Sequence, residues 1–224
     1  MKQLVLSILF IVANAFTGFG HNSKDISNNV TDQVSYISTH YNINQQAVQM
    51  ALTGYQKLRS LGKLVNVQYL TIADFSKPSN EERLFIIDMH IMQVVVKSLV
   101  AHGRNSGTKI ANQFSNRYAS FQSSLGFYIT GGIYKGKHGA SLILEGMEKG
   151  INDQAKDRSI VIHGADYVSN QLIKQQGYIG RSLGCPAVPN NQVVEIINTI
   201  KGASCLFVYA PTNQYLIQSQ LVKN

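Results

Sequence analysis

The stretch IHGADYVSNQLIKQQGYIGRSLGCPAVP, residues 162–189, joins a histidine at the end of an apolar run to a cysteine in a glycine-rich loop. The cysteine, Cys185, lies between Gly184 and Pro186. Glycine permits φ values that are closed to other residues, and proline restricts the residue before it to an extended backbone. The loop therefore fixes the direction of the Cys185 thiol, which is typical of a displayed nucleophile rather than of a packing residue.

The other cysteine of the chain, Cys205, lies in the apolar run SCLFVYA, residues 204–210, which is typical of a buried strand. A cysteine in such a run is a small hydrophobic core residue. Two cysteines in an exported chain can also form a disulfide. The sequence contexts of Cys185 and Cys205 differ, however, and the chain is long enough to fold without a cross-link. We therefore expect two free thiols, with a disulfide as the alternative.

A thiol becomes a nucleophile only as the thiolate, so Cys185 needs a base or a positive environment. His163 ends the apolar run SIVIHG, which would hold its imidazole at the rim of a sheet beside Gly164. The second ring nitrogen needs an orienting acceptor, either Asp166 or a backbone carbonyl. A lone histidine at a strand end can also be purely structural, but a displayed cysteine downstream favours the catalytic interpretation.

The backbone of the cysteine loop restricts where an oxyanion can be bound. Pro186 has no N–H group, so the residue after the cysteine cannot donate. The expected donors are the N–H groups of Cys185 and Gly184, which would stabilise a developing oxyanion by up to several kcal/mol.

Two further histidines, His102 in VAHGRNSG and His138 in GKHGAS, are also followed by glycine. With His163 they leave a three-histidine zinc site open as an alternative. The metalloprotease pattern His-Glu-x-x-His and the glycine-rich phosphate loops are absent, and the scattered acidic residues single out no carboxylate pair for glycoside hydrolysis. The sequence therefore favours cysteine chemistry without a metal or other cofactor.

Short apolar runs separated by glycine-rich turns predict a mainly β fold, a β-sandwich with short helices and an N-terminal helical segment. Strands are expected over 64–76, 83–90, 91–103, 123–134, 140–146, 158–164 and 204–210, the second and third as a hairpin. Helices are expected over 44–61, with Asn44 as N-cap and Gly62 as the stop, and over 190–202. Residues 21–44 are polar and predict a linker or loosely held arm.

The segment from His163-Gly164 to Cys185 resembles the signature of the L,D-transpeptidases, exported bacterial enzymes that cross-link peptidoglycan through a catalytic cysteine. Their motif joins a His-Gly at a strand end to a downstream Ser-x-Gly-Cys loop, which Ser182-Leu183-Gly184-Cys185 matches. The histidine precedes the cysteine, whereas another group of wall-directed cysteine peptidases has the opposite order. The resemblance implies an L,D-transpeptidase-type fold, with Cys185 as nucleophile and His163 as base.

The resemblance extends upstream of the motif and covers about residues 66–210. The run RLFIIDMHIMQVVVKSLVAHGRNSG, residues 83–107, resembles the opening strand hairpin of the family. The run SSLGFYITGGIY, residues 123–134, resembles the Pro-x-Gly-x-Phe strand of the family.

Two positions depart from the common family form, which is Ser-His-Gly-Cys with an arginine two residues after the cysteine. Leu183 replaces the histidine, and Ala187 occupies the arginine position. The version GRSLGCPA resembles the murein L,D-transpeptidase subgroup with GRSxGCPA, which has its own AHGxNSG and GKHGxSL segments. His102 and His138 lie in these two segments here and are expected to replace functions of the missing residues.

The resemblance implies a donor stem peptide that carries carboxylates, which a basic site should recognise. Arg181 lies on the cysteine loop, and its guanidinium can hold a carboxylate with two hydrogen bonds. His138 and the adjacent Lys137 would add positive charge, and Ser182 would support the loop. The expected substrate-binding residues are therefore Arg181, Ser182, His138 and His102. The alternative for Arg181 is a solvated surface residue.

The first fifteen residues, MKQLVLSILFIVANA, contain one lysine, an apolar run over 4–12 and an Ala-Asn-Ala end. This is the layout of a secretory signal peptide with its cleavage site, and the run is short for a permanent membrane span. We expect export to the periplasm or another extracytoplasmic compartment, with no stable membrane insertion after cleavage. A retained N-terminal anchor is the alternative.

The expected organisation is a signal peptide over 1–15, a polar arm and amphipathic helix over 16–65, and the catalytic domain over 66–224. The formal net charge is +8, and loss of Lys2 with the signal peptide would leave +7. Such a charge attracts anionic surfaces such as wall polymers. No arginine-aromatic run or nucleic-acid module is present, so the expected partners are peptidoglycan stem peptides and not nucleic acid.

The expected reaction is attack by Cys185 on the carbonyl of an L-to-D peptide bond, loss of the terminal D-alanine and transfer of the acyl group from the thioester to an amine. An L,D-carboxypeptidase is the alternative within the same chemistry, because water competes for the same thioester. Two other classes stay open: a zinc-dependent wall hydrolase using His102, His138 and His163, and a non-catalytic peptidoglycan-binding module in which Cys185 is structural.

Overall fold

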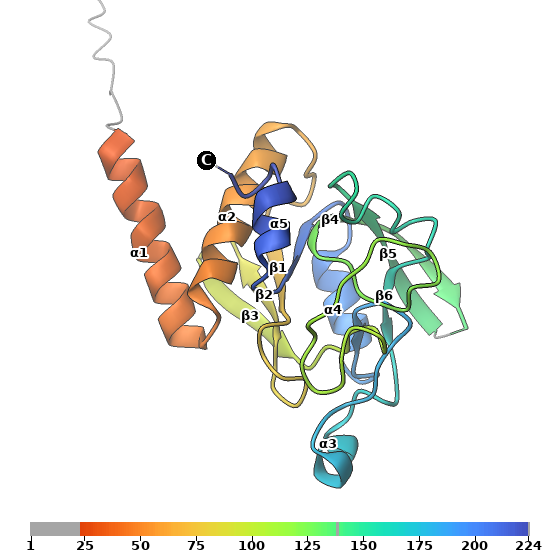
Figure 1. Ribbon diagram of the computed structural model, residues 1–224. Helices are drawn as coiled ribbons and strands as arrows, with labels where there is room; N and C mark the ends of the chain where they lie inside the picture. Colours follow the sequence, from red (N-terminus) through yellow and green to blue (C-terminus); the bar gives the residue numbers. More distant parts are fainter. Residues whose placement is uncertain (1–22, 138, 224) are drawn as a thin grey trace, which may run out of the picture.

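The computed structural model describes residues 23–137 and 139–223, which form five helices and eight strands (Figure 1). The helices are α1 Ser23–Tyr41, α2 Gln45–Ser60, α3 Asn170–Gln176, α4 Val193–Ile200 and α5 Asn213–Gln218. The strands are β1 Tyr69–Asp74, β2 Leu84–Asp88, β3 Gln93–Ser98, β4 Gly126–Gly136, β5 Gly139–Gly146, β6 Val161–Gly164, β7 Ala187–Val188 and β8 Cys205–Tyr209. The predicted mainly β class with short helices is confirmed. The predicted signal peptide, residues 1–15, lies outside the described residues.

All eight strands belong to one sheet, in the order β3-β2-β1-β8-β4-β5-β6-β7. The pairs β1–β8 and β6–β7 are parallel, and the other pairs are antiparallel. Directly after β3, the Ala101 N–H donates to the carbonyl of Ala187 in β7 at 2.8 Å, and the two residues form an antiparallel bridge. The two edges of the sheet therefore meet in a barrel-like closure. This closure brings the segment after β3 against the cysteine loop.

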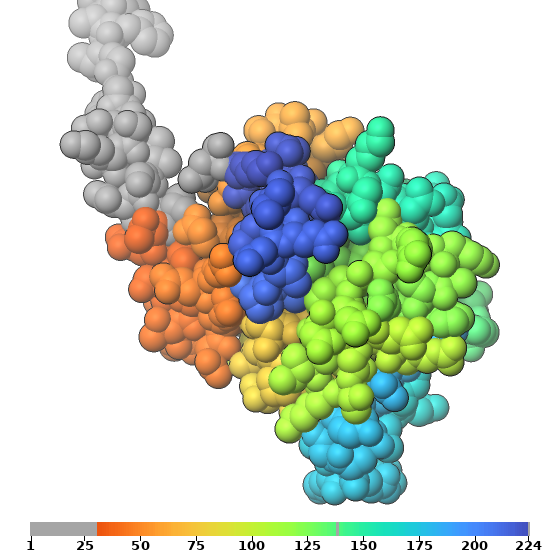
Figure 2. Space-filling view, viewed as in Figure 1, coloured from red at the N-terminus to blue at the C-terminus, as the bar shows by residue number. Residues whose placement is uncertain are grey.

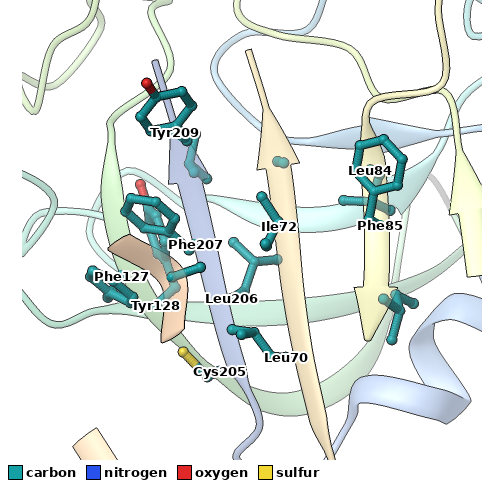
Figure 3. Close-up of a cluster of buried hydrophobic side chains, with 14 of the residues drawn as sticks. Leu70, Ile72, Leu84, Phe85, Phe127, Tyr128, Cys205, Leu206, Phe207 and Tyr209 are labelled. Carbon is teal, nitrogen blue, oxygen red and sulfur yellow. The ribbon is translucent and has the colours of Figure 1, made fainter. Parts of the chain in front are cut away.

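The centre of the sheet is β8, which lies between β1 and β4 and has all five residues buried. Phe207 of β8 stacks on Phe127 of β4 with ring centroids 4.3 Å apart (Figure 3). Cys205 begins the strand and has no exposed surface, so its prediction as a core residue is confirmed. A strand that is covered on both faces has no need of polar residues, which explains its continuous apolar run.

The predicted linker over residues 21–44 is wrong for most of its length, because residues 23–41 form α1. Val34 and Ile37 are buried and lie three residues apart, on the side of α1 that contacts α2. A narrow apolar stripe is enough for a helix when a neighbouring helix covers it. The predicted helix α2 is confirmed, and the Asn44 side chain caps it by accepting two backbone N–H bonds at 2.9 and 3.2 Å.

Three short elements were not predicted: β7, α3 and α5. Helix α3 lies in the connection between β6 and β7, buries no residue and projects from one end of the body (Figure 2). Helix α5 is tied to the core through the buried Glu148 carboxyl, which accepts from the Tyr215 hydroxyl at 3.0 Å and from the Phe127 N–H at 2.8 Å. Elements this short give no periodic signal in a sequence. None of the described helices is long and apolar enough to cross a membrane.

Candidate active site

Cys185 and His163 face the same side of the sheet because of the pairing between β6 and β7. The parallel register places His163 opposite Ala187. Paired residues point to the same face of a sheet, and so do residues two apart in an extended chain. Cys185 lies two residues before Ala187 and is held extended by Pro186, so its side chain points to the same face as that of His163. Both residues line one cleft of about 610 Å³.

The hydroxyl of Ser182 holds the cysteine loop in shape. Its Oγ accepts from the Gly184 N–H at 3.0 Å and donates to the Cys185 carbonyl at 2.6 Å. The main chain of Ser182 is fixed as well, because its N–H donates to the His102 carbonyl at 2.9 Å and its carbonyl accepts from the Arg104 N–H at 2.8 Å. Ser182 lines the cleft but is only 4% exposed. The structure therefore gives it the loop-supporting position that the sequence suggested.

Position 184 requires glycine, because of its backbone conformation and because of the atoms packed around it. Its φ is +127°, and an added Cβ would lie 2.9 Å from the Gln122 carbonyl oxygen. Its N–H is already bonded to Ser182, which corrects the prediction that Gly184 and Cys185 together donate to an oxyanion. The Cys185 N–H, in contrast, donates to none of the described residues. It is a backbone donor on the nucleophile itself that this loop leaves for a developing oxyanion.

The Cys185 thiol is partly exposed and contacts the Ser159 carbonyl, with Sγ and O 3.6 Å apart. Ser159 has a φ of +55°, a conformation uncommon outside glycine. Burial raises the pKa of the Cys185 thiol, while the Val161 N–H, Arg158 and Lys137 act in the opposite direction. A thiol whose pKa is raised needs a base to form thiolate at neutral pH.

The backbone fixes the ring orientation of His163. Its Nδ1 lies 2.8 Å from the Gly164 carbonyl oxygen. A carbonyl can only accept, so Nδ1 carries the proton and Nε2 is the basic nitrogen of the neutral ring. Asp166, the other acceptor that the sequence left open, instead accepts from Nδ2 of Asn190 at 2.6 Å. Gly164 has no room for a side chain, because an added Cβ would lie 2.3 Å from Oδ1 of Asn190.

The described lining of the cleft carries three cations, Lys137, Arg158 and Arg181, and no acidic side chain. Arg181 is exposed, and its Nη1 donates to the carbonyls of Arg104 and Gly107 at 3.2 Å each. These two bonds orient the guanidinium at the cleft. A site with this charge attracts carboxylates.

His102 does not line the cleft, which corrects its expected place among the substrate-binding residues. It has no exposed surface, its Nδ1 lies 2.7 Å from Nη2 of Arg83, and its Nε2 lies 3.2 Å from the Gly107 carbonyl oxygen. His138, the other histidine expected at the substrate, lies outside the described residues. Among the residues that the structure does describe, no three His, Cys, Asp or Glu side chains group as metal ligands.

A family profile for the L,D-transpeptidase catalytic domain matches residues 39–209. The chain belongs to the L,D-transpeptidase catalytic-domain family. The match begins within α1 and includes α2, upstream of the point near residue 66 where the sequence resemblance began.

Solved structures of two L,D-transpeptidases and of a cell shape determining protein are similar to this chain at low identity. The L,D-transpeptidase from Mycobacterium smegmatis is 12% identical, with a TM-score of 0.39, over 64% of this chain and 59% of that one. The L,D-transpeptidase from Stackebrandtia nassauensis is 9% identical, with a TM-score of 0.40, over 76% and 69%. The helical cell shape determining protein from Campylobacter jejuni is 13% identical, with a TM-score of 0.37, over 78% and 62%.

This chain thus spans little more than half of the mycobacterial enzyme. A search of curated proteins found no match. At such identities and TM-scores the assignment to the L,D-transpeptidase family rests on the profile match alone.

Two residues of the L,D-transpeptidase cleft were missed by sequence reasoning, Arg158 and Tyr167. Arg158 lies three residues before the strand that carries His163, and Tyr167 lies three residues after it. Burial, followed by the nearby Cys185, raises the pKa of Tyr167 to about 12. No spacing rule connects these residues to Cys185; their closeness in sequence to His163 was the only available signal.

Proposed function

We propose that this protein is an exported peptidoglycan L,D-transpeptidase in which Cys185 is the acyl-accepting nucleophile and His163 its base. The observation that supports the proposal is the shared cleft, which is lined by a thiol, a backbone-oriented imidazole and three cations. Peptidoglycan stem peptides bear carboxylates, and such a cleft suits them. Export is supported by the signal-peptide pattern of residues 1–15 and by the wall substrate of the family.

The proposed reaction uses the two side chains as nucleophile and base. The Cys185 proton passes to Nε2 of His163, and the thiolate attacks the carbonyl of the L-to-D peptide bond. The Cys185 N–H donates to the oxyanion. Collapse breaks the C–N bond, and the departing D-alanine amine takes the proton from His163. An acceptor amine then loses a proton to Nε2, attacks the thioester and releases the thiolate.

The test is an assay of purified protein on tetrapeptide stems, with and without an amine acceptor, followed by mass spectrometry. We expect an enzyme adduct equal to the stem without its terminal D-alanine, and a cross-linked product when the amine is present. Chelators should leave turnover unchanged and thiol alkylation should abolish it. Hydrolysis in the presence of saturating amine would instead identify an L,D-carboxypeptidase. Chelator-sensitive turnover would identify a zinc hydrolase, and tight binding without turnover a wall-binding module.

Arg181→Lys is expected to raise KM for stem peptide about tenfold, with a smaller change in kcat. Lysine keeps the charge but loses the planar guanidinium and its bonds to the carbonyls of Arg104 and Gly107. Steady-state kinetics measures the change, and the rate of Cys185 alkylation should stay near that of the unmodified protein.

Arg117→Lys is the matched control for this prediction, because Arg117 is exposed and does not line the cleft. It should leave both constants unchanged. If Arg181→Ala retains kcat/KM within about twofold, which is less than ~0.5 kcal/mol of transition-state binding, Arg181 is not a site residue.

A further inference from the structure

Arg158 is a half-buried arginine whose guanidinium is bonded only to neutral oxygens. It directly precedes Ser159, whose carbonyl contacts the Cys185 thiol. Its Nη1 donates to the Ser115 carbonyl at 2.8 Å and to the Ser124 hydroxyl at 2.5 Å, and its Nη2 donates to the Gln122 carbonyl at 2.6 Å and to the Ser120 hydroxyl at 3.3 Å. All four acceptors lie on one segment, residues 115–124, which Arg158 therefore clamps in place.

No carboxylate neutralises this charge within the described residues, where the one ion pair joins Lys77 to Glu81. Burial lowers the pKa of Arg158, which shows that its surroundings disfavour the charge. Holding a cation away from water without an anionic partner is costly. Hydrogen bonds to neutral oxygens reduce that cost but leave the charge of Arg158 uncompensated. The guanidinium can therefore stabilise one anion placed next to it.

The clamped segment places the guanidinium against the cysteine loop. A Cβ on Gly184 would lie 3.2 Å from Nη2 of Arg158 and 2.9 Å from the Gln122 carbonyl oxygen. The Ser123 hydroxyl donates to the Gly184 carbonyl at 3.2 Å, which ties the same segment to the loop. Arg158 and Cys185 also line the same cleft. The absent side chain at Gly184 thus allows the cation to pack directly behind the nucleophile.

We propose that Arg158 is the counter-ion of the Cys185 thiolate, and that it also positions the cysteine loop by clamping residues 115–124. When the thiol proton passes to Nε2 of His163, the anion forms beside a cation that is already in place and stays protonated throughout. Formation of the thioester removes the negative charge, and release of the thiolate restores it. The proposal deepens the proposed function and rests on Cys185 being the nucleophile.

The Val161 N–H lowers the thiol pKa more than Arg158 does but carries no charge, and the other charged groups around the thiol contribute less than Arg158. Lys137 lowers the thiol pKa less than Arg158 does and is exposed, so solvent and salt screen its charge. Tyr167 lines the cleft and Tyr128 lies behind Arg158; burial raises the pKa of both, so they are neutral at pH 7. Arg181 also lines the cleft but is exposed and is not among the groups that shift the thiol pKa. Among the residues that the structure describes, Arg158 is therefore the partly desolvated cation that acts on this sulfur.

The test is the pH dependence of Cys185 alkylation by iodoacetamide, a neutral reagent that needs no peptide substrate. Arg158→Gln removes the charge but keeps hydrogen-bond donors, and we expect the apparent thiol pKa to rise by about one unit, a tenfold loss of thiolate near neutral pH. Arg158→Lys keeps the charge and should restore most of the shift. Lys137→Gln is the matched control and should change the thiol pKa much less. Thermal unfolding of each variant confirms that it is folded.

Two results would overturn the proposal. One is an unchanged thiol pKa in folded Arg158→Gln; the other is an equal rise in Arg158→Gln and Arg158→Lys, which would show that only the clamp matters. If Arg158→Gln does not fold, the Arg158→Lys variant is the test. A role for the charge requires the Cys185 pKa in that variant to stay near its value in the unmodified protein, and a clear rise would overturn the proposal. Because alkylation is independent of turnover, an Arg158-dependent thiol with no activity on stem peptides would support this inference while rejecting the proposed function.

Discussion

Cys185→Ala is expected to abolish acyl-enzyme formation and to reduce kcat by at least ~10⁴-fold. The protein has no second thiol that can substitute. Cys205 has no exposed surface, and burial raises the pKa of its thiol far above the usual range. Intact-protein mass spectrometry after incubation with a stem peptide, or with a carbapenem-type β-lactam, should show one adduct on the unmodified protein and none on the variant.

Cys205→Ala is the matched control, since it removes the other thiol. It deletes one buried heavy atom from the core beside β1 and β4, which should lower the free energy of unfolding by about 1–2 kcal/mol. The adduct and the turnover should both persist. An adduct on Cys205, or a persistent adduct in Cys185→Ala, would show that the nucleophile has been misassigned.

The fold could be predicted where a segment carries its own pattern. The hairpin of β2 and β3, the core strand β8 and helix α2 each have a continuous apolar run, or a capped amphipathic period, that one segment displays alone. Helix α1 could not be predicted, because its apolar stripe of Val34 and Ile37 is too narrow to indicate a helix unless the contact with α2 is known. The closure between Ala101 and Ala187 joins residues far apart in the chain, and no local pattern indicates it.

The candidate active site, like the fold, could be predicted from the sequence only in part. The glycine and proline around Cys185, and the His-Gly pair at the end of β6, indicated the nucleophile and base because backbone constraints are visible in sequence. The sequence could not show that the Gly184 N–H is already used by Ser182, since that depends on a rotamer. Nor could it show Arg158, whose four bonds reach across more than thirty positions to one loop.

His102 illustrates how a histidine beside a glycine can be structural rather than catalytic. An arginine can only donate, so the bond from Nη2 of Arg83 makes Nδ1 of His102 an acceptor, and Nε2 must then carry the proton that it donates to the Gly107 carbonyl. That neutral form is also favoured by the environment: burial, and then Arg83, lower the pKa of His102 to about 4. Because Arg181 binds the same Gly107 carbonyl, the buried ring supports one anchor of the cleft.

This depressed pKa predicts an acid-sensitive fold. In the unfolded chain His102 takes up a proton near pH 6.5, whereas in the folded protein it stays neutral down to about pH 4. Between these values the unfolded state binds more protons than the folded state. The stability that neutral His102 contributes is therefore complete above pH 6.5 and is lost as the pH falls toward 4. The loss amounts to about 3 kcal/mol. Glu148, whose pKa burial raises, acts in the opposite direction and is retained in every variant compared.

The measurement is urea unfolding of the unmodified protein and of His102→Gln at several pH values between about 4 and 7.5. Glutamine keeps one acceptor for Arg83 and one donor for the Gly107 carbonyl but does not titrate, so the variant should lose less stability on acidification by about 3 kcal/mol, whatever its stability at neutral pH. His40→Gln, at an exposed histidine of α1, should leave the slope unchanged. Parallel pH profiles for the unmodified protein and His102→Gln would mean that His102 is protonated in the folded state, and the bond from Arg83 could not then exist.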